Sequence, residues 1–320
     1  MSRLTRRTVI LVGLEASYGA GMPAEIIPLL VEDPDFQIDR DLVPRTLVRQ
    51  YLGGAEHLIG TRRAIVKFKT ELQGAGVADT PPAWGALMRA CGLAQTITTT
   101  AGEKRVTYSP ISTGFESLCI HFYRDGVRYN TRGVRGTVKL DLTAYQRPMA
   151  EWEFWGFDTA ASEVAVPTDT SFAAWKRPVI ITDANSGDIR VGCTLNLGEP
   201  AGGTVMSSRG MTVDIGNKLS HLKLLGGEEI SITDRDITGQ MTVAMTAADE
   251  VTWRTDINTN TLTSVGLRVG NTSGYRVRTF GGAVQRVNPQ AVDYEGRLMI
   301  QSDLRFLPSA GNDDILIMAA

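Results

Sequence analysis

The sequence has few of the residues from which metal sites and disulfide frameworks are built. It contains three cysteines and three histidines in 320 residues. Cys91, Cys119 and Cys193 are odd in number and widely spaced, so we expect free, buried thiols. A zinc site needs about four ligands, and no CxxC or HxxxH pair supplies them, although Cys119 and His121 share one face of a predicted strand. We predict no metal and no cofactor.

Catalytic signatures are also missing. There is no G-x-S-x-G segment for a nucleophilic serine. The segment VILVGLEASYGAG runs from a strand into glycines, but their spacing does not match the G-x-G-x-x-G of a dinucleotide site. Acidic pairs such as Asp33 and Asp35 lie in turn-like contexts without the aromatic platform expected of a glycosidase. The sequence therefore predicts no enzyme and no catalytic residues.

Neither charge nor hydrophobicity connects the chain to nucleic acid or to a membrane. With 33 basic and 35 acidic residues, the net charge of −2 gives no electrostatic reason for nonspecific binding to nucleic acid or anionic lipid. No apolar stretch approaches the length of a membrane span. The run TVILVG is too short for the core of a signal peptide and soon meets Glu15. We expect a protein that folds in a cytoplasm.

What the sequence does have is a strong β pattern. GTVKLDL alternates Val138, Leu140 and Leu142 with charged residues, as a half-buried strand does. Asp125-Gly126 supplies the residues of a tight hairpin turn. Two segments, TPPAWGALMRACG and TAADEVTWRTDI, have helical spacing and a threonine in the cap position. The sequence predicts a mainly β protein with one helix in each half.

Two pairs of short blocks suggest that the chain contains one unit twice. LGGAEHLIGTR (52–62) and LGGEEISITDR (225–235) share Leu, Gly, Gly, Glu, Ile and Arg. YNTRGVRGTV (129–138) and YRVRTFGGAV (275–284) share Tyr, Arg, Gly and Val. The blocks occur in the same order, and each is flanked by the same predicted elements, which favours a duplication.

The duplication predicts the domain boundaries. We expect a first domain at 1–165 and a second at 175–320, joined by a linker within 158–178 that is rich in Ala, Ser, Thr, Asp and Pro. The first copy carries extra residues around its helix, which we place at TTTAGEKRVTYSPISTG (98–114).

A segment that leads into the first repeated block is longer than an ordinary loop. EDPDFQIDRDLVPRTLVRQYLGG mixes apolar residues with charges of both signs, and so long a loop is usually functional. We predict a projecting arm at about 32–45 that is mobile in the free subunit and buried against a neighbouring subunit after assembly. The candidate subunit-interface residues are Asp33, Phe36, Ile38, Arg40 and Leu42.

These patterns resemble the major tail tube proteins of long, flexible-tailed bacteriophages, in particular the type with two tube domains found in Mu-like siphophages. The resemblance is carried by GLEASYGAGMPAE, KFKTELQGAG, TPPAWGALMRACGL and RDGVRYNTRGVRGTVKLDL in the first half, and by DIGN and ISITDRDITGQMTV in the second. It implies two tandem tail-tube-like β-sandwich or barrel domains, each with one flanking α-helix. It also implies that the protein is a structural component of the virion.

The resemblance further implies how the protein works. Copies would self-assemble into stacked rings that form a hollow tube, the conduit for genome ejection into the host. The partners would be the chain itself and tail proteins such as the tape measure, tail terminator and distal tail protein, with assembly in the cytoplasm of the bacterial host. A duplicated unit implies rings of three chains with pseudo-sixfold symmetry. DNA would pass without specific binding, so we expect a neutral to negative lumen wall.

The alternative is a carbohydrate- or receptor-binding β module of a phage tail or cell surface. Such a module needs aromatic side chains in its loops. Trp84, Trp152, Trp155 and Trp253 fall instead within predicted regular elements, and Trp175, in the predicted linker, is the exception.

Overall fold

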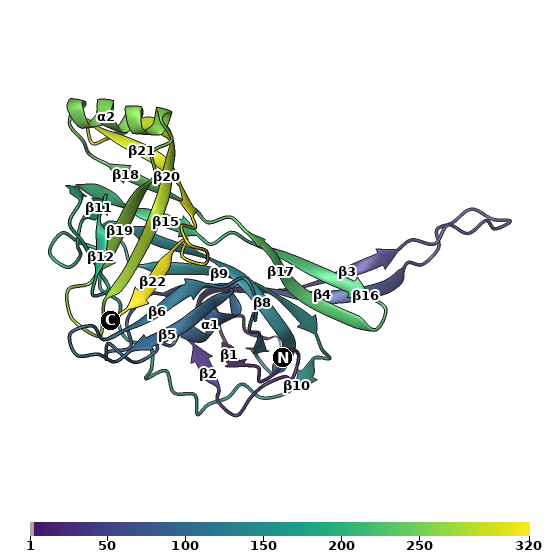
Figure 1. Cartoon of the computed structure of the whole chain (residues 1–320). Coiled ribbons are helices and arrows are strands. Elements are labelled where there is room, and N and C mark those ends of the chain that lie inside the picture. Colours follow the sequence, from purple (N-terminus) through teal and green to yellow (C-terminus); the bar gives the residue numbers. More distant parts are fainter. Residues whose placement is uncertain (1–2) are drawn as a thin grey trace.

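Antiparallel strands make up most of the molecule. The computed structural model describes residues 3–320 and contains long β-strands with two short helices (Figure 1). This confirms the mainly β class predicted from the sequence. Asp125 and Gly126 form the turn between two strands, and both have the positive φ angles, 39° and 89°, that a tight hairpin of this kind requires.

The first half of the chain forms a sheet with a hairpin inserted after its helix. Its main strands are β1 (Thr8–Leu14), β2 (Ile27–Leu29), β3 (Glu32–Val43), β4 (Leu58–Glu71), β7 (Leu118–Arg124), β8 (Val127–Thr143) and β9 (Met149–Asp158). They pair in the order β2–β1–β7–β8–β9–β4–β3. Helix α1 (Gly85–Ala90) follows β4, and the hairpin of β5 (Leu93–Thr98) and β6 (Arg105–Pro110) overlaps the segment predicted to be extra. The short β10 (Ser162–Glu163) pairs with β8.

The second half repeats this pairing order. Its corresponding strands are β11 (Ile189–Val191), β14 (Thr204–Met206), β15 (Ser208–Asp214), β18 (Thr238–Val243), β19 (Thr263–Val269), β20 (Val277–Tyr294) and β21 (Arg297–Leu307). They pair as β14–β11–β19–β20–β21–β18–β15. Helix α2 (Ala247–Asn258) follows β18 as α1 follows β4. The remaining strands are β12 (Thr194–Asn196), β13 (Glu199–Ala201), β16 (Asn217–Leu224), β17 (Gly227–Arg235) and β22 (Leu316–Ala319).

The two halves are joined edge to edge. β15 pairs with β8, and β22 pairs with both β20 and β6. One continuous run of eight strands therefore crosses the molecule in the order β3–β4–β9–β8–β15–β18–β21–β20. One face of this run is apolar and lies in a single core that spans both halves. Its buried side chains include Val66, Phe68, Val138, Leu140, Trp152, Phe154, Val213, Met241, Leu304 and Phe306.

The helices differ in how deeply they are buried. Trp84 and most of α1 are fully buried, and Trp84 donates a hydrogen bond from Nε1 to the backbone oxygen of Gln73 at 2.8 Å. Helix α1 begins after Trp84 rather than at Thr80 as the sequence suggested, because a residue that precedes proline is disfavoured in the helical region. In α2 the predicted capping box is present between Thr246 and Asp249, but only Trp253 is buried.

Candidate assembly surfaces

The eight-stranded run has a polar face opposite its apolar one, because side chains alternate along each strand. On this polar face Lys67 of β4 lies opposite Glu153 of β9, with Nζ and Oε2 2.8 Å apart. Lys69 lies opposite Glu151 at 3.1 Å. The hydrogen bond to Glu151 raises the pKa of Lys69. Partial burial raises the pKa of Glu153, but hydrogen bonds from Lys67 and Trp155 outweigh burial and lower it. Both shifts favour the charged forms of Lys69 and Glu153.

Acidic side chains outnumber basic ones on this polar face. The acidic positions in register with these pairs are Glu32, Asp35, Asp39, Glu71, Asp141, Glu151, Glu153, Asp214 and Asp303. The basic positions are Arg63, Lys67, Lys69, Arg135, Lys139 and Arg305. Most of the basic groups are held by carboxylates, as in Arg63 with Asp39 at 2.7 Å and Arg305 with Asp236 at 2.9 Å. The polar face carries a net negative charge.

Each end of the eight-stranded run has an unpaired edge. β3 pairs with β4 on one side, and within residues 3–320 no strand pairs with its other side. β20 pairs with β21 along most of its length, but on its second side the pairing with β19 ends at Val284. The outer part of β20, residues 285–294, is therefore a second open edge in the described chain. Open strand edges present unpaired N–H and C=O groups and are templates for pairing with another chain.

The junction between the halves shows how such an edge can be closed. β15 pairs with β8 from Gly210 opposite Thr143 to Asp214 opposite Lys139. Gly210 has φ of +88°, and a side chain there would collide with the carbonyl oxygen of Leu142. The close approach of the two backbones at this junction therefore requires glycine.

The segment DIGN, which carries part of the family resemblance, completes the junction. Asn217 is buried and donates from Nδ2 to the backbone oxygens of Cys91 at 2.6 Å and Gly136 at 2.9 Å. Gly216 has φ of +63° and redirects the chain out of the sheet, and its N–H donates to the carboxylate of Asp214 at 2.9 Å. The segment thus attaches the second half to the first and starts the β16–β17 hairpin.

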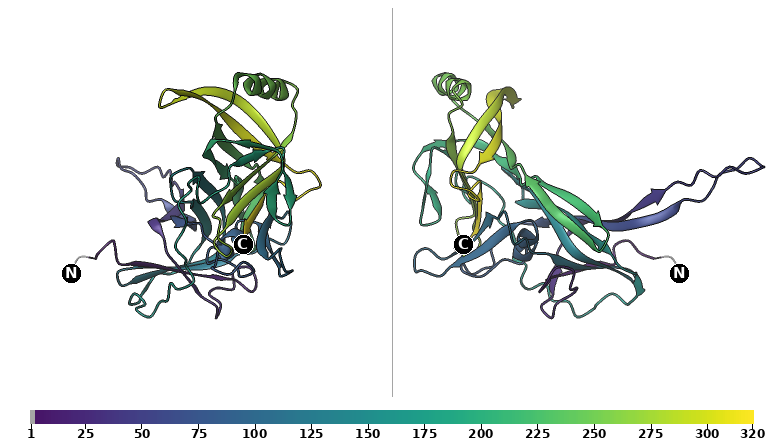
Figure 2. Two further views of the ribbon diagram at one scale, coloured as in Figure 1. Left: turned by 90° about the vertical axis from the view of Figure 1, so that its left-hand side faces the viewer. Right: turned by 45° about the vertical axis from the view of Figure 1, so that its right-hand side comes forward.

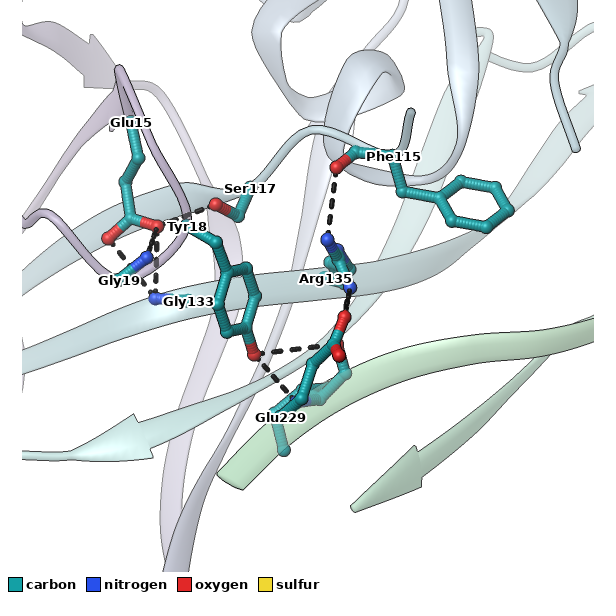
Figure 3. A network of polar contacts seen from close by, with 9 residues as sticks. Glu15, Tyr18, Gly19, Phe115, Ser117, Gly133, Arg135 and Glu229 are labelled. Atoms are coloured by element: carbon teal, nitrogen blue, oxygen red, sulfur yellow. Dashed lines mark hydrogen bonds and ion pairs between the residues drawn. The ribbon is translucent and has the colours of Figure 1, made fainter. Parts of the chain in front are cut away.

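The β16–β17 hairpin docks on the first half of its own chain. Arg135 of β8, only 6% exposed, donates to the carboxylate of Glu229 at 2.5 Å, the backbone oxygen of Ile230 at 2.9 Å and that of Phe115 at 3.0 Å (Figure 3). The backbone N–H of Ile230 donates to the hydroxyl of Tyr18 at 2.6 Å. Burial is the main cause that raises the pKa of Tyr18 to about 12, so it stays protonated.

The segment GLEASYGAG, which also carries the resemblance, positions Tyr18. The carboxylate of Glu15 accepts hydrogen bonds from the N–H groups of Gly19 at 2.8 Å and Gly133 at 3.1 Å and from the hydroxyl of Ser117 at 2.6 Å (Figure 3). Glu15 thereby fixes the loop after β1 against β8. The glycines of this segment support a loop and not a nucleotide.

The β3–β4 hairpin forms an arm that extends away from the body (Figures 1 and 2). We use "arm" for residues 32–71, including the irregular tip at 44–57. The base of the arm belongs to the first half, because the Phe36 ring lies 4.7 Å from Tyr129 and 5.4 Å from Phe122 between ring centres. Farther out, the arm leaves the core.

The candidate interface residues predicted from the sequence are spread along β3. Phe36 packs on the core of its own half and Ile38 is half-buried, whereas Asp33, Arg40 and Leu42 are exposed. The interface candidates did not include the exposed apolar side chains at the outer end of the arm, although the sequence from 43 to 59 contains them. They are Val43, Leu47, Val48, Tyr51, Leu52, Leu58 and Ile59.

The cysteine and histidine residues considered as metal ligands pack as ordinary parts of the fold. The three cysteines are free and buried, as predicted. The thiol of Cys119 contacts the side chain of Asn130, and burial lowers the pKa of His121 to about 4. Within residues 3–320 no group of three or more His, Cys, Asp or Glu side chains is placed to hold a metal ion. In the same range, neither helix has the length and hydrophobicity to cross a membrane.

A family model described as phage tail tube protein matches residues 5–307, almost the whole chain. The chain belongs to the phage tail tube protein family. This confirms the resemblance seen in the sequence at the level of the family. No curated protein is significantly similar to the chain. The family is structural and belongs to the phage virion, which agrees with surfaces made of strand edges, a polar sheet face and a projecting arm.

Proposed function

We propose that this protein is the subunit of a hollow phage tail tube through which the genome is ejected into the host. The observation that carries the proposal is the eight-stranded run with an unpaired edge at both ends and a net negative polar face. In a ring, the edge of β3 in one copy pairs with the open part of β20 in the next. Ring closure leaves no exposed edge, which removes the risk of uncontrolled strand addition.

The ring consists of three chains with pseudo-sixfold symmetry. Each chain contributes two tail-tube-like domains, at 1–165 and 175–320, and the common pairing order of the two halves supports this division. The β8–β15 junction within the chain is the counterpart of the β20–β3 junction between chains. Repetition of one head-to-tail contact with a closing rotation gives a ring rather than a filament.

The polar face of the eight-stranded run lines the lumen. Each lysine or arginine that binds a phosphate releases counterions and adds affinity, so a wall with free basic groups would retain DNA. Here the basic groups are mostly neutralised by carboxylates such as Glu151 and Glu153. A net negative wall lets DNA pass without specific binding.

The subunit assembles in the cytoplasm of the bacterial host and becomes part of the virion. Rings stack on one another to form the tube of a long, flexible, siphophage tail of the Mu-like type. The ends and the lumen of such a tube provide surfaces for other tail proteins, of which the tape measure, the tail terminator and the distal tail protein are the expected partners. The exposed apolar end of the arm supports contact between copies.

Electron microscopy of the purified protein, together with native mass measurement, tests the proposal. We expect rings or tubes, and a ring mass of three chains. Particles that stay monomeric at high concentration, or rings of six two-domain chains, would contradict it.

The carbohydrate- or receptor-binding alternative lacks an aromatic platform. Trp84, Trp152, Trp175 and Trp253 are buried, and Trp155 is half-buried with the guanidinium of Arg63 stacked 3.9 Å from its ring centre. Trp175, the one tryptophan outside the predicted elements, donates to the backbone oxygen of Pro28 at 2.7 Å. We therefore favour the tube.

A further inference from the structure

We infer that the outer half of the arm, residues 40–60, docks on the second half of a neighbouring copy of this chain. The acceptor surface consists of the loop at 259–262, the exposed Gly282 and the start of the open stretch of β20 at Gln285. The contact copies the docking of the β16–β17 hairpin on the first half. The inference rests on the proposed ring, in which a first half follows the second half of the preceding copy.

The two hairpins start from equivalent points of the pairing order. The ladder between β3 and β4 has a bulge directly after Glu32, which lies opposite Lys69, and β15 ends at Asp214, which lies opposite Thr238. Lys69 and Thr238 in turn lie opposite Glu151 of β9 and Arg305 of β21, at equivalent points of the pairing order. A backbone kink with positive φ follows in both cases, at Asp33 (49°) and at Gly216 (63°).

The ordered parts of the two hairpins also correspond. β3 ends at Val43 and β4 resumes at Leu58, whereas β16 ends at Leu224 and β17 begins at Gly227. The hairpins differ mainly in their tips, which are residues 44–57 in the arm and residues 225–226 in the shorter hairpin.

Within residues 3–320, the apolar side chains of β17 are buried against the same chain, whereas those at the outer end of the arm stay exposed. In β17, Ile230 is fully buried and Ile232 nearly so against the first half. At the end of the arm, Leu42 is 58% exposed and lies opposite Ile59, which is 68% exposed. Val43 and Leu58 form the next opposed pair and point to the other face, so both faces of the arm end are apolar. Contiguous exposed apolar groups of this kind mark an interaction site.

The corresponding acceptor surface on the second half is exposed. The repeated block aligns Gly136 of β8 with Gly282 of β20. In the first half the carbonyl of Gly136 accepts a hydrogen bond from Asn217 of the docked hairpin. Gly282 is exposed, and only the ring of Phe280 lies within 4 Å of the position that a Cβ would take. Leu262, in the loop after α2, is also exposed.

Crosslinking in the assembled full-length protein tests the docking. A photoreactive amino acid replaces Ile59, and protein grown on light and heavy nitrogen is mixed before assembly, so that crosslinks between copies carry both labels. We expect mixed-label crosslinks to residues within 259–285. The same probe at Val251, on the exposed side of α2, serves as the control and should give none to that range.

A variant pair provides a second measurement. L42D combined with I59D should leave the subunit folded, because both side chains are exposed, and should lower the yield of rings and tubes at least tenfold. V251D should assemble like the unmodified protein. Three results would contradict the docking while leaving the proposed ring intact. Rings would form in each case, but the crosslinks would stay within one copy, reach the first half of another copy or not appear. If the unmodified protein forms no rings, the proposed function itself fails.

Discussion

The two hairpins that project from the sheet show how one structural unit can serve two purposes. The β16–β17 hairpin is folded against its own chain, with Arg135 and Tyr18 holding its backbone, while the arm extends from the body with its apolar end exposed. They start from equivalent strand positions, so the sheet does not dictate this difference. What differs is the neighbour, because the second hairpin has the first half of its own chain beside it. The arm needs another copy to provide that surface.

This comparison predicts that equal changes in the two hairpins have unequal effects on the subunit. The largest effect should come from I230A, which removes a fully buried side chain and leaves a cavity between β17 and β8. We expect a loss of about 3 kcal/mol in the free energy of unfolding of the unassembled subunit. The matched variant I59A should change it by less than about 0.5 kcal/mol, because that side chain is exposed. Urea denaturation of both variants measures the difference, and similar losses would show that the arm is already docked in the free subunit.

The polar anchor of the shorter hairpin should have the next largest effect. N217A leaves the backbone oxygens of Cys91 and Gly136 without their side-chain donor in a buried site. We expect a cost of about 2 kcal/mol, since a buried unsatisfied acceptor loses its partner without regaining water. D35A, at the corresponding position beyond the kink of the arm, is the matched control and should be nearly neutral. An N217A subunit with unchanged stability would mean that the junction is held by strand pairing alone.

Proteolysis should separate the two tips. Residues 44–57 form no regular structure and are mostly exposed, whereas residues 225–226 are a tight turn. In the unassembled subunit we expect the first cuts within 44–57 and none at 225–226. Assembly should slow these cuts about tenfold, equivalent to about 1.4 kcal/mol of protection. Mass spectrometry of the fragments locates the cuts, and equal cutting rates before and after assembly would rule out burial of the arm tip.

The strands and turns of this fold could be predicted because they depend on local patterns. Alternation in GTVKLDL located part of β8, and Asp125-Gly126 located the hairpin turn between β7 and β8. The repeated blocks pointed to equivalent elements but not to equivalent residues in every case. The alignment of the LGG blocks makes Met241 the counterpart of Phe68. Strand pairing, followed from the equivalent residues Val138 and Val284, makes Ile237 its counterpart, four residues earlier. The irregularities in the hairpins shift the register, and a short sequence match does not record them.

The docking contacts could not be predicted from the sequence. Arg135 and Glu229 are far apart in the chain, and so are Asn217 and Cys91. Their meeting depends on how the second half folds over the first, which no local period encodes. Asn217 in particular follows Gly216 and is indistinguishable in sequence from a loop asparagine. The arm was found because it is unusually long, but its packing residue Phe36 could not be told apart from its exposed neighbours.

The smallest expected effect concerns the one ionic contact between the two hairpins within residues 3–320. Lys223 of β16 contacts the carboxylate of Asp41 on the arm, and hydrogen bonds from Lys223 and Thr61 lower the pKa of Asp41 below its ordinary value of 3.8. A carboxyl group with a lowered pKa in the folded state stabilises the protein above that ordinary value, and the contribution is lost as the pH falls through the folded-state pKa. The pair is exposed, so salt screens it and its effect on stability is slight.

Titration of the Asp41 carboxyl carbon by NMR measures this contact directly. In the unassembled subunit we expect its pKa below 3.8, and in K223M we expect it to rise toward that value while the hydrogen bond from Thr61 keeps part of the shift. T61V is the matched control and should remove the other part. If K223M leaves the titration of Asp41 unchanged, the β16–β17 hairpin does not lie beside the arm in solution. The arm would then be free along its whole outer length, and the contrast between the docked and the free hairpin would become sharper.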